Sequence, residues 1–155
     1  MASTKAFISN ATQVSTGANT DETDLVTGTI TGGTLGTDLD TLYIRAFGNF
    51  ADNANGKRLK FYWDGNVITD TGAQAWQNQG WQLHVIIIRR GATSQSIHAQ
   101  FIPAIAGVSA SPGEFSAEAS TLSGDVPIKI TGTNSSASAG DITFEGWFVQ
   151  KIGAP

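Results

Sequence analysis

Two histidines, His84 and His98, are the first candidates for metal chemistry in this chain. Each lies in a stretch whose core-facing residues are odd-numbered, so both imidazoles should project from the outward face of a predicted strand pair. A structural zinc site needs four ligands and a catalytic one needs three, but neither stretch adds an acidic residue or another histidine. We therefore expect no metal and no other cofactor. Instead of a metal site, the two histidines should form a half-exposed hydrogen-bonding pair.

Carboxylates are the second candidates, because five of them fall within a short part of the chain: Asp21, Glu22, Asp24, Asp38 and Asp40. They could offer oxygen ligands to calcium, but EF-hand spacing is absent and aspartates before strands commonly cap turns. A carboxylate pair could also hydrolyse a glycosidic bond if it were held about 5 to 9 Å apart. The sequence alone does not fix such a separation.

Other catalytic patterns are missing from the sequence. There is no cysteine, and no serine stands in a Gly-x-Ser-x-Gly elbow. The glycine-rich run 28–36 has neither a phosphate-binding lysine nor dinucleotide spacing. We therefore interpret its glycines as turn residues. We therefore expect a protein that is not an enzyme.

Charge limits the possible partners. The net charge is −4 and there are nine Lys and Arg residues, whereas binding to nucleic acid depends on clustered basic side chains. The densest basic positions are Lys57, Arg58, Lys60, Arg89 and Arg90. They could bind an acidic partner or sulfated sugars, but a solvated strand face is favoured in a chain so poor in charge.

Trp76 lies in a polar loop, Gln74–Gly80, and is the candidate ligand-binding residue. An exposed tryptophan could stack on a sugar ring. Alternatively, the indole could fold back as a lid on the end of the domain, since large aromatic side chains bury most of their area. Both interpretations remain open at this level.

The elements that would position these residues are short strands. Only 14% of the residues are charged, yet four Trp and eight Phe can supply the core of a single domain. Stretches with period-two alternation are separated by Gly, Asn, Asp and Ser, and no helical pattern is convincing. This predicts an all-β, antiparallel β-sandwich of about eight strands. No apolar run approaches a membrane span, and the first residues do not resemble a secretory leader, so we expect a soluble protein made in the cytoplasm.

The alternation assigns each side chain to a face. We predict four core-facing sets before residue 140, and a fifth near the end of the chain: Leu42, Ile44, Ala46, Gly48 and Phe50; Leu59, Phe61 and Trp63; Ile97, Ala99 and Phe101; Val126, Ile128 and Ile130; and Ile142, Phe144, Gly146 and Phe148. Asp64-Gly65 is a hairpin signal. Pro127 cannot donate to a ladder, so its strand should be peripheral or begin there.

Large apolar residues at outward positions indicate an interface. They are Ile86, Ile88, Ile102, Trp147 and Val149. Since a soluble monomer rarely exposes such a patch, we expect these residues to form an oligomer interface.

Two segments fall outside the alternation. Residues 1–22 are rich in Ser, Thr and Asn and should form an extended N-terminal arm that docks on a neighbour, with a single domain over 23–155. Residues 104–120 should form a long loop.

Several runs resemble a known group of proteins: residues 41–60 (TLYIRAFGNFADNANGKRLK), 70–73 (DTGA), 130–133 (ITGT) and 140–146 (GDITFEG). Over about residues 23–150 the chain resembles small jelly-roll proteins and domains of tailed-bacteriophage virions. Members of that group are typically homotrimers that serve as capsid decoration, head fibres or tail-fibre tips.

The resemblance implies a non-enzymatic, trimeric capsid decoration (cement) protein of a virion. Its partners would be further copies of itself and the major capsid protein or another virion protein, gripped by residues 1–22, with neither nucleic acid nor membrane involved. The alternative is a receptor-binding tip that recognises a host surface glycan through loops 74–80 and 104–119. A carboxylate-based glycosidase is a third, more distant hypothesis.

Overall fold

The computed structural model describes residues 6–104 and 114–152, and every regular element among them is a β-strand. The strands are β1 (Ala6–Asn10), β2 (Val14–Ser15), β3 (Thr23–Ile30), β4 (Thr41–Phe50), β5 (Lys57–Trp63), β6 (Asn66–Asp70), β7 (Gln79–Gly91), β8 (Ser94–Pro103), β9 (Glu114–Glu118), β10 (Val126–Asn134) and β11 (Ile142–Ile152). The all-β prediction is confirmed. The described residues form eleven strands, where about eight were expected, because three short strands (β1, β2 and β9) lie in the segments expected to be arm and loop.

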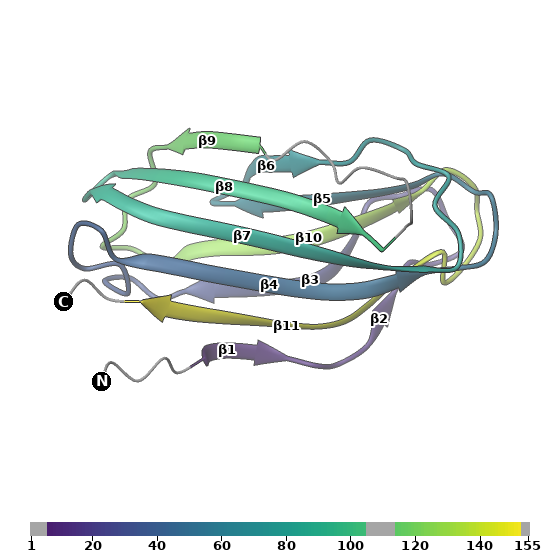
Figure 1. Ribbon diagram of the computed structural model, residues 1–155, viewed down its shortest axis with the longest axis horizontal. Coiled ribbons are helices and arrows are strands. Elements are labelled where there is room, and N and C mark those ends of the chain that lie inside the picture. The colour runs from purple at the N-terminus through teal and green to yellow at the C-terminus, as the bar shows by residue number, and fades with distance from the viewer. Residues whose placement is uncertain (1–5, 105–113, 153–155) are drawn as a thin grey trace.

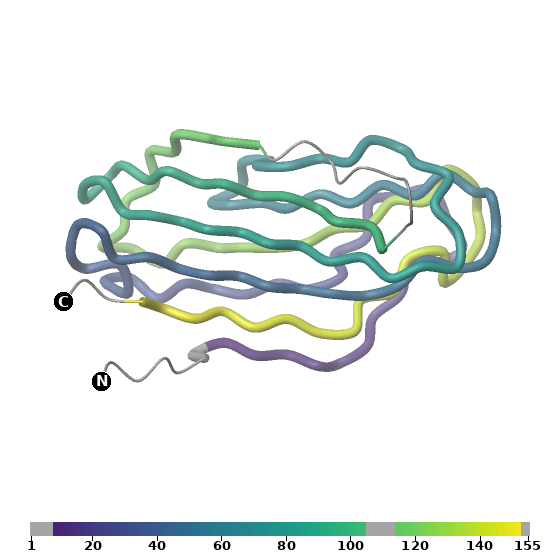
Figure 2. Tube along the Cα trace, in the orientation of Figure 1, coloured from purple at the N-terminus to yellow at the C-terminus, as the bar shows by residue number. Residues whose placement is uncertain are grey.

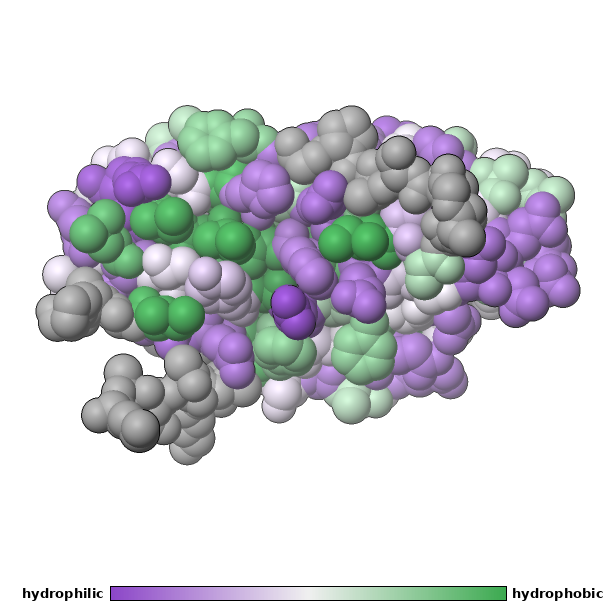
Figure 3. Space-filling model, viewed as in Figure 1, coloured by the Kyte–Doolittle hydropathy of each residue, from purple (hydrophilic) through white to green (hydrophobic). Residues whose placement is uncertain are grey.

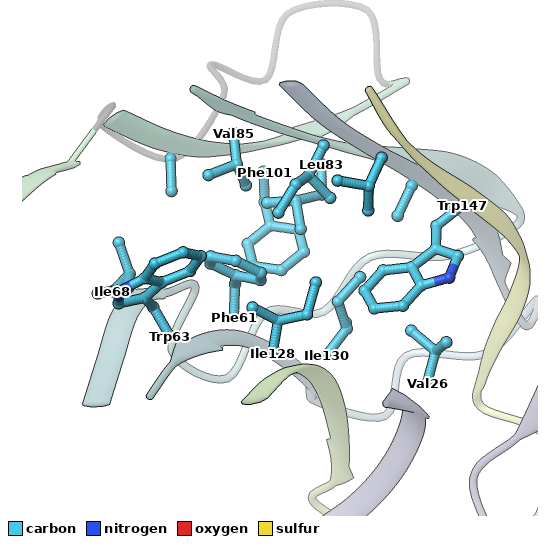
Figure 4. Close-up of a cluster of buried hydrophobic side chains, with 14 of the residues drawn as sticks. Val26, Phe61, Trp63, Ile68, Leu83, Val85, Phe101, Ile128, Ile130 and Trp147 are labelled. Carbon is cyan, nitrogen blue, oxygen red and sulfur yellow. The ribbon is translucent and has the colours of Figure 1, made fainter. Parts of the chain in front are cut away.

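The strands form two sheets, and every neighbouring pair is antiparallel. The larger sheet has the order β1-β11-β4-β7-β8-β9, with β2 also paired to β11, and the smaller sheet has the order β3-β10-β5-β6. Figure 1 shows the larger sheet in front of the smaller one. Side chains from both sheets meet between them in one apolar core, so the prediction of an antiparallel β-sandwich is confirmed (Figure 4).

The inward sets before residue 140 are those that the alternation predicts. On β4 and β5 every second residue is buried, and the even positions of β10 from Val126 to Ile130 are buried as well. The hairpin between β5 and β6 turns at Asp64 and Gly65, whose φ angles of 49° and 81° suit a tight turn.

The parity predicted for β11 is wrong after Phe144. Phe144 pairs with Gly48 and Gly146 pairs with Phe47, so Glu145 is an extra residue that forms a β-bulge. A one-residue shift moves every later side chain to the other face of the sheet. Trp147 and Val149 consequently lie in the core, with exposed fractions of 3% and 0%.

Trp147 is therefore not part of an exposed interface. Figure 4 shows its indole directed into the space between the sheets. Gly28 of β3 makes room for it, because a Cβ there would stand 2.7 Å from the indole ring. Val149 likewise packs inside, whereas Phe148, predicted to be internal, is only half-buried.

The strand that contains Pro127 is not peripheral. β10 pairs with β3 on one side and with β5 on the other. Pro127 is its second residue, so the missing N–H falls at the beginning of the strand, as expected, rather than in the middle of the ladder.

The N-terminal segment is not a separate arm over the part that is described. β1 pairs with one stretch of β11 and β2 with another, and Figure 2 shows β11 between β1 and β4 although these segments are far apart in sequence. β9 likewise occupies the end of the expected loop 104–120. Residues 1–5 and 105–113 lie outside the described residues. The described part of the chain contains no helix long and apolar enough to cross a membrane.

Candidate functional site

The outer face of the larger sheet brings together most of the outward-pointing residues singled out in the sequence. Strand register aligns them in rows across the sheet. One row consists of Gln150, Tyr43, Ile86, His98 and Phe115, and the adjacent row of Phe148, Arg45, His84 and Gln100. Since each row combines apolar with polar side chains, the face is amphipathic.

Several large apolar side chains are exposed on this face. Tyr43, Phe47, Phe115 and Ile152 have exposed fractions of 37%, 48%, 71% and 43%. They are four of the six large apolar side chains that are strongly exposed among the described residues. Three isoleucines predicted to lie in the interface, Ile86, Ile88 and Ile102, point outward on the same face and are half-buried. Figure 3 shows hydrophobic and hydrophilic side chains interspersed over β4, β7 and β8.

A shallow hollow lies at the β4–β11 side of this face. Its volume is about 280 Å³, and it is lined by Tyr43, Arg45, Phe148, Gln150 and Ile152. Two aromatic rings beside a guanidinium group form a surface that can receive a side chain from a partner.

The charged groups of this face are mostly basic. Arg45 and Arg90 accompany the two histidines, whereas Glu145, at the end of the face, accepts hydrogen bonds from Asn49 and Gln13 at 2.8 Å each. Burial and the nearby Arg45 lower the pKa of His84 below its ordinary value. The neutral form of His84 is therefore favoured, and the two arginines would suit an acidic partner surface.

The two histidines share this face, as the parity predicts. His84 pairs with Gln100 and His98 pairs with Ile86, so the imidazoles are diagonal rather than opposite. His84 Nε2 lies 3.1 Å from Gln82 Oε1. No group of three metal-ligating side chains occurs within the described ranges.

Trp76 does not form an exposed stacking platform. Its exposed fraction is 8%, and its ring centre lies 5.2 Å from that of Phe50. Backbone hydrogen bonds between Lys57 and Gln74, of 2.8 and 2.9 Å, hold the loop against the sandwich. The interpretation of Trp76 as a lid is the correct one, because its indole is buried at the end of the core.

Most of the acidic and basic candidate residues form separate ion pairs instead of one cluster. The pairs are Glu22 with Lys60 (2.6 Å), Asp24 with Lys129 (2.9 Å), Asp38 with Arg89 (3.1 Å), Asp40 with Lys151 (2.9 Å) and Asp70 with Arg58. Asp40 also accepts a hydrogen bond from the Thr37 N–H, which is the turn-capping role expected of it. Most of the candidate carboxylates are thus neutralised by separate partners, an arrangement that does not resemble a calcium site.

Lys57, the remaining basic candidate, is fully buried. Its ammonium group donates to Asn53 O, Asn53 Oδ1 and Asn55 O at 2.8, 2.9 and 3.1 Å. The amides of Asn53 and Asn55 in turn donate to the buried Asp141 carboxylate at 2.7 and 2.9 Å. This network ties the loop between β4 and β5 to the start of β11 and leaves Lys57 no surface on which to bind a partner.

Several residues of the outer face were not among the predicted interface residues. The alternation places Tyr43 and Phe47 on the outward side of β4 with Arg45, as the structure confirms, but they were not assigned to the interface. Phe148 could not be found in this way, because the bulge at Glu145 reverses its parity. Phe115 lies in a segment that carries no alternation signal of its own.

No protein-family model matches the chain, and no curated protein matches it in sequence. Among solved structures, the CBM2 module of the evolved Dit of Lactobacillus casei BL23 phage J-1 is similar, at 13% identity and a TM-score of 0.39. The match covers 83% of this chain and 69% of that chain. A likeness at this TM-score does not establish a shared fold or function.

Proposed function

We propose that this chain is a non-enzymatic structural protein of a tailed-phage virion, a trimeric capsid decoration protein whose subunits meet through the outer face of the larger sheet. The observation that carries the proposal is the exposure of Tyr43, Phe47, Phe115 and Ile152 on that one face. Fully burying a large apolar side chain contributes about 1.5 to 3 kcal/mol, so covering this face would stabilise an assembly.

The partner of this face is a second copy of the chain. A cyclic trimer requires two different patches, one on each side of every contact. The face carries Arg45 and Arg90, whereas the whole chain has a net charge of −4, so the remaining residues together carry a net negative charge. The β6–β9 edge carries part of this negative charge: Glu118 accepts a hydrogen bond from Asn66 at 3.0 Å, and Glu114 lies near Asp70. Burial and the nearby Asp70 raise the pKa of Glu114, which would gain from a cation supplied by a neighbour.

The resemblance of residues 41–60 and the other quoted runs supports three parts of this proposal. These are the location in a virion, the trimeric state and the jelly-roll connection of the strands. A grip on the capsid by the N-terminal segment also stays a proposal, since residues 6–15 pair with β11 and residues 1–5 lie outside the described ranges. The glycan-binding alternative through loops 74–80 and 104–119 is weakened, because Trp76 is buried.

The oligomeric mass tests this proposal. Multi-angle light scattering of the wild type should give three times the chain mass, and Phe47→Asp should lower it by placing an unpaired charge in the contact. Thr27→Asp, at an exposed position on the smaller sheet, is the matched control and should keep the trimeric mass. A monomeric wild type, or an unchanged mass for Phe47→Asp, would contradict the subunit contact.

The position in the particle needs a separate measurement. Quantitative mass spectrometry of purified virions should find hundreds of copies for a capsid protein. A few copies per particle would place the chain in the tail and overturn the decoration role.

A further inference from the structure

A second, larger hollow lies on the outer face of the smaller sheet, on the opposite side of the sandwich from the proposed subunit contact. Its volume is about 540 Å³, and its lining includes Thr27, Thr29, Tyr62, Gly65, Pro127 and Lys129. Hollows of about 300 to 1,000 Å³ are typical of small-molecule sites.

The hollow results from a step in side-chain length across the strands. Strand register places Thr27, Lys129 and Tyr62 in one row, and Thr29 and Pro127 in an adjacent outward row. The second row ends at the turn, where Asp64 N–H donates to Pro127 O at 2.9 Å and Gly65 has no side chain. Short residues therefore form the floor, and the long Tyr62 and Lys129 side chains form a wall.

The wall is held in place by an ionic network. The Tyr62 hydroxyl donates to Glu22, which also accepts from Lys60 at 2.6 Å and from Thr131 at 2.8 Å. Lys129 Nζ lies 4.8 Å from the centre of the Tyr62 ring and pairs with Asp24 at 2.9 Å. A ligand would therefore meet an aromatic wall that loses little conformational entropy on binding.

The charges at this hollow are compensated. Each lysine near the ring has its own carboxylate, Glu22 for Lys60 and Asp24 for Lys129, so the site offers no unpaired cation to an anionic ligand. The hydroxyls of Thr27 and Thr29 are exposed, and no hydrogen bond within the described part of the chain engages either of them. The floor and wall otherwise present proline, threonine methyl and tyrosine ring atoms.

We propose that this hollow binds a neutral saccharide residue. The apolar face of the sugar ring packs on Pro127 and Tyr62, and its hydroxyl groups exchange hydrogen bonds with Thr27 and Thr29. An anionic ligand would find no unpaired cation in this hollow. A wholly apolar ligand would leave both threonine hydroxyls without partners. This site is separate from the proposed subunit contact and gives the protein a ligand-binding role besides assembly.

The test is an NMR titration of the full chain with four uncharged sugars: methyl α-D-glucopyranoside, methyl α-D-galactopyranoside, methyl α-L-rhamnopyranoside and N-acetyl-D-glucosamine. At least one should shift the amide signals of residues 27–29, 62–65 and 128–129. Thr29→Arg, which fills the hollow from an exposed position, should weaken binding by about tenfold or more.

Thr93→Arg, in the exposed β7–β8 turn, is the matched control and should bind like the wild type. Glucuronic acid, an anionic sugar, and toluene, an uncharged apolar compound, are the comparison ligands. The proposal is overturned if none of the neutral sugars shifts these signals, if only a comparison ligand does, or if Thr29→Arg binds sugar like the wild type. The light-scattering mass of Thr29→Arg should stay trimeric, so failure of sugar binding and failure of the assembly are separate results.

Discussion

Replacing Lys57 by Met should destabilise the domain strongly, although the aliphatic part of the side chain is conserved. The fully buried Lys57 ammonium donates to three oxygens of Asn53 and Asn55, and these two residues bind the buried Asp141. A buried acceptor left without a donor costs about 1 to 3 kcal/mol. Removing one partner of a buried charge pair costs about 3 to 5 kcal/mol. Because the three acceptors belong to one loop that can partly relax into water, we expect a loss of about 3 to 5 kcal/mol.

Urea unfolding followed by tryptophan fluorescence measures this loss as a lower midpoint at an unchanged slope. Lys60→Met is the matched control, since Lys60 lies on the same strand and pairs with Glu22 near the surface. It should cost about 1 kcal/mol or less. Adding Asp141→Asn to Lys57→Met should recover part of the loss, because the uncompensated buried carboxylate is removed.

A loss below about 1 kcal/mol for Lys57→Met would refute this reasoning. The same conclusion would follow if Lys57→Met and Lys60→Met had equal effects, since burial would then not distinguish the two ammonium groups.

Three further predictions concern the core and two titrating groups. Phe144→Ala should destabilise the domain by about 3 to 5 kcal/mol through lost burial and a cavity, measured by the same urea unfolding, and a loss under about 1 kcal/mol would contradict its core position. Burial raises the pKa of Glu22, but hydrogen bonds from Lys60, Tyr62 and Thr131 outweigh this effect and lower it from 4.5 to about 2. The stability that Glu22 contributes should therefore be complete above pH 4.5 and be lost as the pH falls toward about 2, so Glu22→Gln should unfold with a shallower pH dependence over that window, as followed by circular dichroism. Burial and Arg45 lower the pKa of His84, so the contribution of its neutral form should be complete above pH 6.5 and decline below it. His84→Gln should accordingly make the stability of the domain depend less on pH below 6.5, as measured by urea unfolding; an identical pH profile for the variant would exclude His84 as the cause.

The local pattern of the sequence determined the class of fold and most of the core. Successive side chains of a strand must point to opposite faces, so the inward sets of β4, β5, β8 and β10 could be assigned from alternation alone. The Asp64-Gly65 turn was equally local, because its positive φ angles depend on the residue types themselves. The same reasoning placed Ile86, Ile88 and Ile102 on the outward face.

Only the tertiary structure decided the features that depend on pairing between distant segments. The bulge at Glu145 exists because β11 must match β4 across one additional residue, and it sends Trp147 into the core beside Gly28. Any extended segment could in principle pair with the edge of β11. In the structure β1 and β2 do so, although they lie more than a hundred positions away from β11 in the sequence. The hollow at Tyr62 likewise depends on the register of β3, β10 and β5, which brings short and long side chains into adjacent rows. Period-two alternation carries no information about register or strand order, and these two properties determine which outward side chains become neighbours.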